Sequence, residues 1–437
     1  MALADYRADR GLGQRDGRAR PETPGLSGPG FSVYTSGPMP MITDNKALED
    51  FCGRLAAAPY ITVDTEFMRE RTYWPILCLV QVAGPGEAKA VDALAPGMDL
   101  APLFRLMRDE KVLKVFHAAR QDMEIFHHLS GRLPTPVFDT QVAAMVCGFG
   151  DSVGFETLVT QLSGARVDKG SRFTDWALRP LSERQVTYAL NDVVLLRPAY
   201  EKLRQRLSAN GREEWLEEEM ATLTDTATYD ADPMDAWRRI KTRAADGRVL
   251  AVLRELAAWR ENEARRRDLP RNRVLRDEAL IEIAHHTPAT PEELARTRGL
   301  GGKMATGPQG ADILAAVRRG VAVKPEDRPR PHLRPEVPRG LGPVTDLLKV
   351  LLKMKSEDSH IATKLLASAA DIEEIAAFGD KADVPALKGW RRQVFGEDAL
   401  RLRQGEMSLA ISGKKLKLVA RPSEATEGHA APAKMKN

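Results

Sequence analysis

The chain has 437 residues, of which 43% are hydrophobic and 29% charged, and its formal net charge is +4. This length exceeds one ordinary hydrophobic core, so several domains are expected. The composition is that of a soluble globular protein, and no apolar run approaches the roughly 18 residues of a membrane span. The small positive charge permits an acidic partner such as nucleic acid but does not require one.

The first forty residues are dominated by Gly, Pro, Arg and Ser and show no periodicity. Such a segment predicts a disordered N-terminal extension, residues 1–40. It lacks the apolar core of a secretory signal. The three cysteines, Cys52, Cys78 and Cys147, are widely spaced and form no metal or disulfide pattern. Both features favour a cytoplasmic protein in a reducing compartment.

Ordered elements are expected from Thr43, a candidate N-cap of a helix that runs to about Ala57. Apolar runs then alternate with amphipathic ones, which predicts a mixed sheet flanked by helices. The expected strands are 60–67, 76–83, 88–91 and 112–116, and the expected helices are 100–108, 120–129, 139–148, 155–162 and 182–208. Gly84, Pro85 and Gly86 separate the second and third strands, as in a hairpin.

The strand YITVDTEF carries Asp64 and Glu66 two positions apart. On a strand these side chains point to the same face. Neighbouring carboxylates repel each other and need a compensating cation, and a hard divalent metal takes oxygen ligands of this kind. The alternative is a polar strand end that enters a loop.

Two later motifs carry further acidic residues. Asp122 lies in HAARQD, at the start of a helix that follows a strand, where sheet proteins commonly place ligands. It also suits the dipole of that helix. In YALND, Tyr188 and Asp192 lie one helical turn apart on the same face, which is also common for an ordinary surface pair.

Taken in order, these motifs resemble the tyrosine-bearing branch of the DEDD 3′→5′ exonucleases. The segments LCLVQVA, HAARQD, VFDTQVAA and DWALRPLSERQVTYALNDV are similar to those of the ribonuclease D family. The resemblance spans about residues 42–207 and implies an RNase H-like α/β fold. It also implies that two Mg²⁺ or Mn²⁺ ions support hydrolysis, with nucleoside 5′-monophosphates as products.

The resemblance further implies a role for each of five residues. The metal-binding carboxylates would be Asp64, Glu66, Asp122 and Asp192, and Tyr188 would position the attacking water.

Other residues have less specific signals. Phe67 is a candidate for stacking on a terminal base, or else a core aromatic. Lys169 and Arg172 are candidates for holding the phosphate backbone, or else part of a solvated loop. Asp139 is expected to cap a helix, with support of a metal ligand as the alternative, and Gln81, inside a buried strand, is expected to be structural.

Downstream, the segment LAAWRENEARRRDLPRNRVLRDEALIEIA resembles the HRDC domain, a small helical bundle. From Arg238 to Arg276 there are 13 Lys and Arg against 5 Asp and Glu, a field that suits a polyanion or a solvated helix face. A Pro/Arg-rich linker follows, and then a second HRDC-like helical stretch that ends in a hairpin-like pattern at Met407–Val419. The predicted segments are an exonuclease domain 41–222, a linker 223–237, an HRDC domain 238–325, a linker 326–342, a second HRDC-like domain 343–420 and a disordered tail 421–437.

The leading hypothesis is an exoribonuclease that trims RNA with a free 3′ end, with tRNA precursors as the family's typical substrate. No membrane and no obligate protein partner are expected. A 3′→5′ DNA exonuclease remains an alternative, because DNA-directed members share the catalytic motifs. The second alternative is a non-catalytic nucleic-acid-binding scaffold. The presence of all five catalytic positions argues against this alternative.

Overall fold

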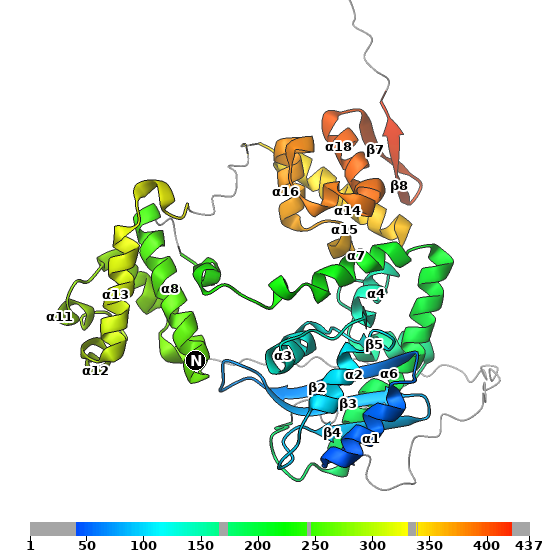
Figure 1. Cartoon of the computed structure of the whole chain (residues 1–437). Coiled ribbons are helices and arrows are strands. Elements are labelled where there is room, and N and C mark those ends of the chain that lie inside the picture. Colours follow the sequence, from blue (N-terminus) through cyan, green and yellow to red (C-terminus); the bar gives the residue numbers. More distant parts are fainter. Residues whose placement is uncertain (1–40, 166–173, 243–245, 331–337, 339, 422–437) are drawn as a thin grey trace, which may run out of the picture. The chain divides into compact units, whose positions relative to one another are not determined.

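The computed structural model describes residues 41–165, 174–242, 246–330, 338 and 340–421. The first part of the chain forms a six-stranded sheet with the order β1-β4-β3-β2-β5-β6 (Figure 1). The strands are β1 (Met41–Ile42), β2 (Tyr60–Met68), β3 (Ile76–Gly84), β4 (Glu87–Asp92), β5 (Leu113–Phe116) and β6 (Val137–Asp139). β3 pairs antiparallel with β2 and β4, whereas the pairs β1–β4, β2–β5 and β5–β6 are parallel. The predicted mixed sheet is confirmed.

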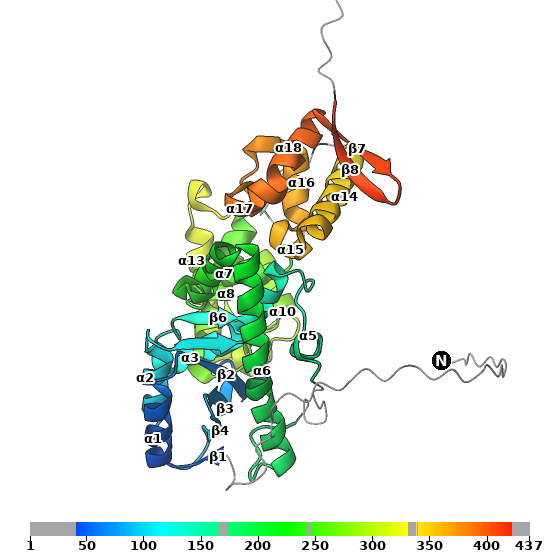
Figure 2. The ribbon, with the colours of Figure 1, turned by 90° about the vertical axis from the view of Figure 1, so that its right-hand side faces the viewer.

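Helices cover both faces of this sheet. On one face the buried side chains of Ile61 and Val63 pack with helices α1 (Asn45–Leu55), α2 (Ala101–Arg108) and α3 (Arg120–Ser130). On the other face lies α6 (Glu183–Asn210), where the Thr62 hydroxyl donates to the Val193 carbonyl at 2.8 Å. Figure 2 shows α1 and α6 on opposite sides of the strands. The remaining helices of this part are α4 (Thr140–Val146), α5 (Phe155–Ser163) and α7 (Glu213–Thr224).

Two local predictions differ from the structure. The N-cap of α1 is Asp44 rather than Thr43, and its carboxylate accepts a hydrogen bond from the Ala47 amide at 2.9 Å. Strand β1 ends at Ile42, so Thr43 lies between this strand and the N-cap residue. The strands β1 and β6 were not expected, since runs of two and three residues carry no readable alternation.

The second part of the chain is helical. Its elements are η1 (Thr226–Thr228), η2 (Pro233–Arg239), α8 (Gly247–Arg267), α9 (Arg271–Val274), α10 (Asp277–His286), α11 (Pro291–Leu294), α12 (Gly302–Thr306), α13 (Pro308–Ala322) and η3 (Pro325–Asp327). Their core contains Leu256, Leu280 and Ile313, each fully buried. At Gly320 a Cβ atom would lie 2.4 Å from the Val252 Cα, so glycine lets α13 approach α8 closely. η2 adds Ala236 and Trp237 to this core.

The third part is also helical and ends in a hairpin. Its helices are α14 (Gly342–Ser359), α15 (Thr363–Leu366), α16 (Ala369–Phe378), η4 (Gly379–Lys381), η5 (Pro385–Leu387), α17 (Gly389–Arg391), the π-helical turn η6 (Arg392–Gly396) and α18 (Glu397–Gln404). Strands β7 (Met407–Ser412) and β8 (Lys415–Ala420) pair antiparallel, which confirms the predicted hairpin. In the described ranges, no helix is long and apolar enough to cross a membrane.

Candidate active site

The candidate site lies where β2 faces α6. Asp64 and Glu66 project from the same face of β2, because they are two positions apart on the strand. Asp192 projects from α6, which begins with a capping box formed by Ser182 and Gln185. One carboxylate oxygen from each of these three acids lies within 4.8 Å of the other two. The structure therefore brings together three of the four carboxylates that the sequence singled out.

We define the acidic cluster as Asp64, Glu66 and Asp192. Its surroundings disfavour the negatively charged form of each carboxyl group. Burial raises the pKa of Asp64 to about 6. Burial, reinforced by the neighbouring carboxylates, raises the pKa of Glu66 to about 9 and that of Asp192 to about 8. A divalent cation would offset the same repulsion, and an all-oxygen donor set fits Mg²⁺ or Mn²⁺. The residues present thus fit a hard metal ion.

Asp122 lies beside the acidic cluster but turns toward another partner. It is 6% exposed, in the first turn of α3, and its Oδ1 accepts a hydrogen bond from the Thr65 hydroxyl. Burial and the charge of Asp64 hold its pKa well above the usual range of an aspartate. Asp122 is therefore electrostatically coupled to Asp64, although its oxygens are not among the three that converge.

Tyr188 and Asp192 lie one turn apart on α6, as the sequence predicted. A hydrogen bond with Tyr188 acts to lower the pKa of Asp192, against the larger effect of burial. The Tyr188 ring lies 6.3 Å from that of Trp176, with an angle of 30° between the planes. The phenol is thereby held at the edge of the acidic cluster.

The residues suggested for RNA contact are less well defined. Phe67 is partly buried and packs against the core beneath α1 and α3, next to an irregularity in the β2–β3 register. Lys169 and Arg172 lie outside the described residues. The segment just after them is anchored by Arg179, which pairs with Asp92 at 2.6 Å and donates to the Cys78 carbonyl at 3.0 Å.

Thr65, between the two acids of the DTE motif, had no predicted role. In the DTE motif its side chain alternates with those of Asp64 and Glu66, and its hydroxyl donates to Asp122 on α3. The alternation of a strand gives this orientation, but the partner on α3 comes from tertiary packing. Asp139 was expected to cap a helix, and it does so for α4 by accepting from the Gln141 amide at 2.8 Å. It also accepts from the Ala118 and Ala119 amides, which fixes the loop before Asp122.

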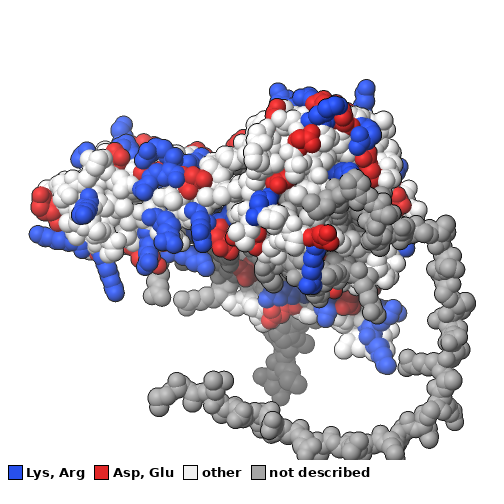
Figure 3. All heavy atoms as spheres, turned by 90° about the horizontal axis from the view of Figure 1, so that it is seen from below, with Lys and Arg blue, Asp and Glu red and all other residues white. Residues whose placement is uncertain are grey.

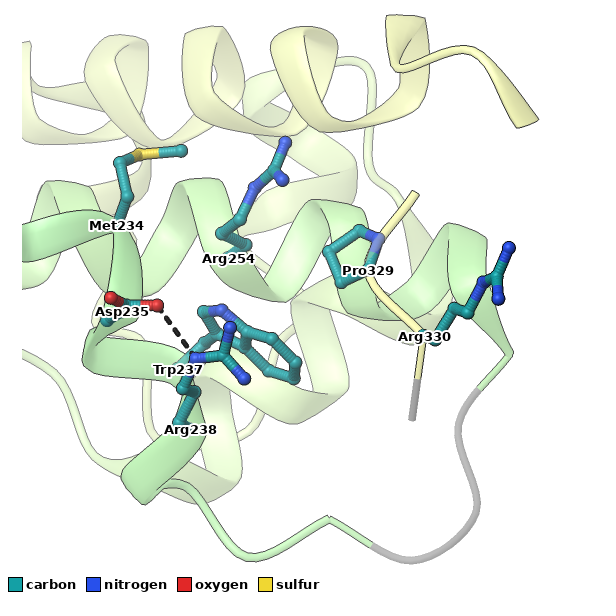
Figure 4. Close-up of a pocket in the computed structure, with 7 residues that line it drawn as sticks. All are labelled: Met234, Asp235, Trp237, Arg238, Arg254, Pro329 and Arg330. Carbon is teal, nitrogen blue, oxygen red and sulfur yellow. Dashed lines mark hydrogen bonds and ion pairs between the residues drawn. The ribbon is translucent and has the colours of Figure 1, made fainter. Parts of the chain in front are cut away.

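The second part of the chain contains an arginine-lined hollow of about 220 Å³ (Figure 4). It is lined by Met234, Asp235, Trp237, Arg238, Arg254, Pro329 and Arg330. The Arg238 guanidinium lies over the Trp237 ring at 5.1 Å and pairs with Asp235 at 2.7 Å. The Arg254 Nε is buried without a hydrogen-bond partner. Figure 3 shows many Lys and Arg side chains on the left of the molecule, with fewer acidic ones between them.

The chain is similar to known proteins over most of its length. A family model described as 3′-5′ exonuclease matches residues 39–208, and one described as HRDC domain matches residues 249–317. The chain is 51% identical over 383 residues to a ribonuclease D of Nitrobacter hamburgensis, covering 88% of this chain and 100% of that protein. It is 50% identical over 380 residues to a ribonuclease D of Granulibacter bethesdensis, covering 87% and 96%. Among solved structures, the chain is similar to Escherichia coli RNase D, described as an exoribonuclease involved in structured RNA processing. The TM-score is 0.72 and the sequence identity is 34%, and the match covers 84% of this chain and 99% of that chain.

Proposed function

Since this chain belongs to the ribonuclease D family and is a 3′–5′ exoribonuclease, we propose that it hydrolyses RNA at the acidic cluster on β2 and α6. The observation that supports this placement best is the convergence of three carboxylate oxygens within 4.8 Å of one another. In this proposal the catalytic domain spans residues 41–222, an HRDC domain spans 238–325 and a second HRDC-like domain spans 343–420.

The carboxylates of the site would hold two divalent cations, Mg²⁺ or Mn²⁺. Asp64, Glu66 and Asp192 supply oxygens that already converge, and Asp122 supplies a fourth carboxylate coupled to Asp64. When bound, the two cations acidify water and offset the negative charge on the phosphate and on the leaving oxygen. The protein contributes the position of each carboxylate, which comes from strand β2, helix α3 and helix α6.

Tyr188 is the proposed positioning group for the attacking water. Its hydroxyl hydrogen-bonds with Asp192, so the phenol and the carboxylate form one polar unit that can orient a water molecule. The pKa of Asp192 is raised by burial, and this carboxyl can therefore hold a proton near neutral pH until the site is loaded.

The substrate is RNA, and we place tRNA precursors with a 3′ extension first among candidates. Single nucleoside 5′-monophosphates are the products of cleavage from the 3′ end. The excess of basic residues on α8 and around the arginine-lined hollow suits contact with the phosphate backbone, which gives affinity without reading bases. We also place the reaction in the cytoplasm, in keeping with the free thiols of Cys52, Cys78 and Cys147.

The test uses a 5′-labelled tRNA precursor with a 3′ extension and a matched single-stranded DNA. Each is incubated with Mg²⁺, with Mn²⁺ and with EDTA, and the lengths of the products are followed over time. We expect stepwise shortening of the RNA from its 3′ end, stopped by EDTA and much slower on DNA. Shortening of DNA at an equal or higher rate would move the physiological substrate to DNA, and binding without cleavage would contradict the catalytic assignment.

A further inference from the structure

Gln81 is a buried polar residue without partners. It lies on β3 and is 0% exposed, and neither its Oε1 nor its Nε2 has a hydrogen-bond partner. A glutamine amide offers two donor hydrogens and two acceptor lone pairs. Leaving such groups buried and unpaired costs stability, and native proteins retain few of them. An amide with a purely structural role would be expected to find partners, as the hydroxyl of Thr62 does on the same face of the sheet.

The register of the sheet places Gln81 beside the acidic cluster. Gln81 is the antiparallel partner of Asp64, and residues directly opposite each other project to the same face. Its neighbours on that face, Leu79 and Ala83, pack in clusters that contain Ala189 and Val193 of α6, respectively. The amide of Gln81 therefore lies beneath the turn of α6 that carries Asp192.

We propose that Gln81 is a positioning residue for the metal site, whose amide finds its partners only in the cation-loaded form. Gln81 faces Asp64 across the β2–β3 register, and neither polar atom of its amide has a partner in the described structure. Metal-ligating carboxylates are acceptors only, so in a loaded cluster they would lie beside the donor N–H groups of Gln81. The amide then stabilises the loaded arrangement of Asp64 and Asp192, in the way that outer hydrogen-bond partners orient metal ligands elsewhere.

This inference rests on the proposed function, since it assumes that the acidic cluster binds a divalent cation. It acts through Asp64 and Asp192 rather than on the RNA. It also predicts an unusual combination of effects. Removing the amide should stabilise the metal-free protein, because two buried unpaired groups disappear, and should weaken binding of the cation.

The experiment measures Mn²⁺ binding to the full chain by electron paramagnetic resonance, together with the melting temperature in EDTA. For Gln81→Met, which nearly conserves volume, we expect a higher melting temperature and a Mn²⁺ affinity lower by about tenfold or more. The matched control is Thr62→Val, on the same face of the sheet, where the hydroxyl has a partner at 2.8 Å. This control should lower the melting temperature and leave the Mn²⁺ affinity unchanged.

The outcomes separate this inference from the proposed function. Mn²⁺ affinity within twofold of wild type in Gln81→Met, or equal losses in Gln81→Met and Thr62→Val, would overturn the role of Gln81. Unchanged Mn²⁺ affinity in Asp192→Asn would instead contradict the proposed metal site itself. If Gln81→Met does not fold, Gln81→Asn keeps the amide but withdraws it by one methylene. It should then also weaken Mn²⁺ binding, and wild-type affinity in that variant would refute the inference.

Discussion

Loading the acidic cluster with a divalent cation should release protons, and the structure gives their number. At pH 7 the carboxyls of Glu66, with a pKa of about 9, and Asp192, with a pKa of about 8, are mostly protonated. Asp64, with a pKa of about 6, is mostly ionised at that pH. Metal ligands must be deprotonated, so loading should release about two protons from the three groups, which titrate as one coupled set.

This proton release sets the pH dependence of metal binding. Because about two protons leave as the cation enters, the apparent affinity should rise by about a hundredfold for each unit of pH near neutrality. The pKa of Asp122 is also raised by burial, so any involvement of this carboxyl would increase the number further.

Isothermal titration of Mn²⁺ into the protein, in buffers of different ionisation enthalpy at one pH, counts the protons directly. A matched control is Glu124→Gln, because Glu124 lies on α3, near Asp122 in sequence, but is paired with Arg69 at 2.7 Å. Its proton release should equal that of wild type, whereas Asp192→Asn should release about one proton fewer. Release of less than one proton per loaded protein, with an affinity that is flat in pH, would show that the carboxyls are already ionised and refute this reasoning.

Three further predictions concern activity, stability and RNA binding. Tyr188→Phe should lower kcat by about a hundredfold and leave RNA affinity unchanged, because it removes only the hydroxyl that pairs with Asp192. Single-turnover cleavage assays and binding assays measure these two quantities separately. Unchanged turnover would contradict the proposed role of Tyr188. The metal-free protein should lose stability as pH rises from about 4 to 9, because the folded state keeps protons that the unfolded chain has already released. Each contribution is lost between the ordinary pKa of the group, 3.8 for aspartate and 4.5 for glutamate, and its raised pKa of about 6 for Asp64, 8 for Asp192 and 9 for Glu66. Urea unfolding in EDTA measures this loss, and a flat profile would contradict it. Arg330→Gln should weaken RNA binding and reduce its salt dependence by about one unit of slope, because this exposed side chain lines the arginine-lined hollow. Arg105→Gln, whose guanidinium pairs with Glu49 on the catalytic domain, should change neither.

Much of the candidate site could be predicted from the sequence because it depends on local periodicity. The period of two along a strand puts Asp64 and Glu66 on one face, and the period of an α-helix puts Tyr188 and Asp192 on one face. The mixed sheet and the terminal hairpin also follow from patterns within single segments. The strands β1 and β6 did not follow, because they are too short to show a pattern and form only by pairing with strands distant in the chain.

The tertiary structure alone decided the features that join distant segments. The packing of β2 against α6 sets the distances among the three carboxylates and their raised pKa values. Packing of α3 against the other face of β2 turns Asp122 toward Thr65, and the β2–β3 register sets Gln81 opposite Asp64. Side-chain periodicity is a property of neighbouring residues, whereas burial and register arise only when separate segments pack together. The sequence by itself therefore determined which chemical groups are present, and the fold decided how these groups interact.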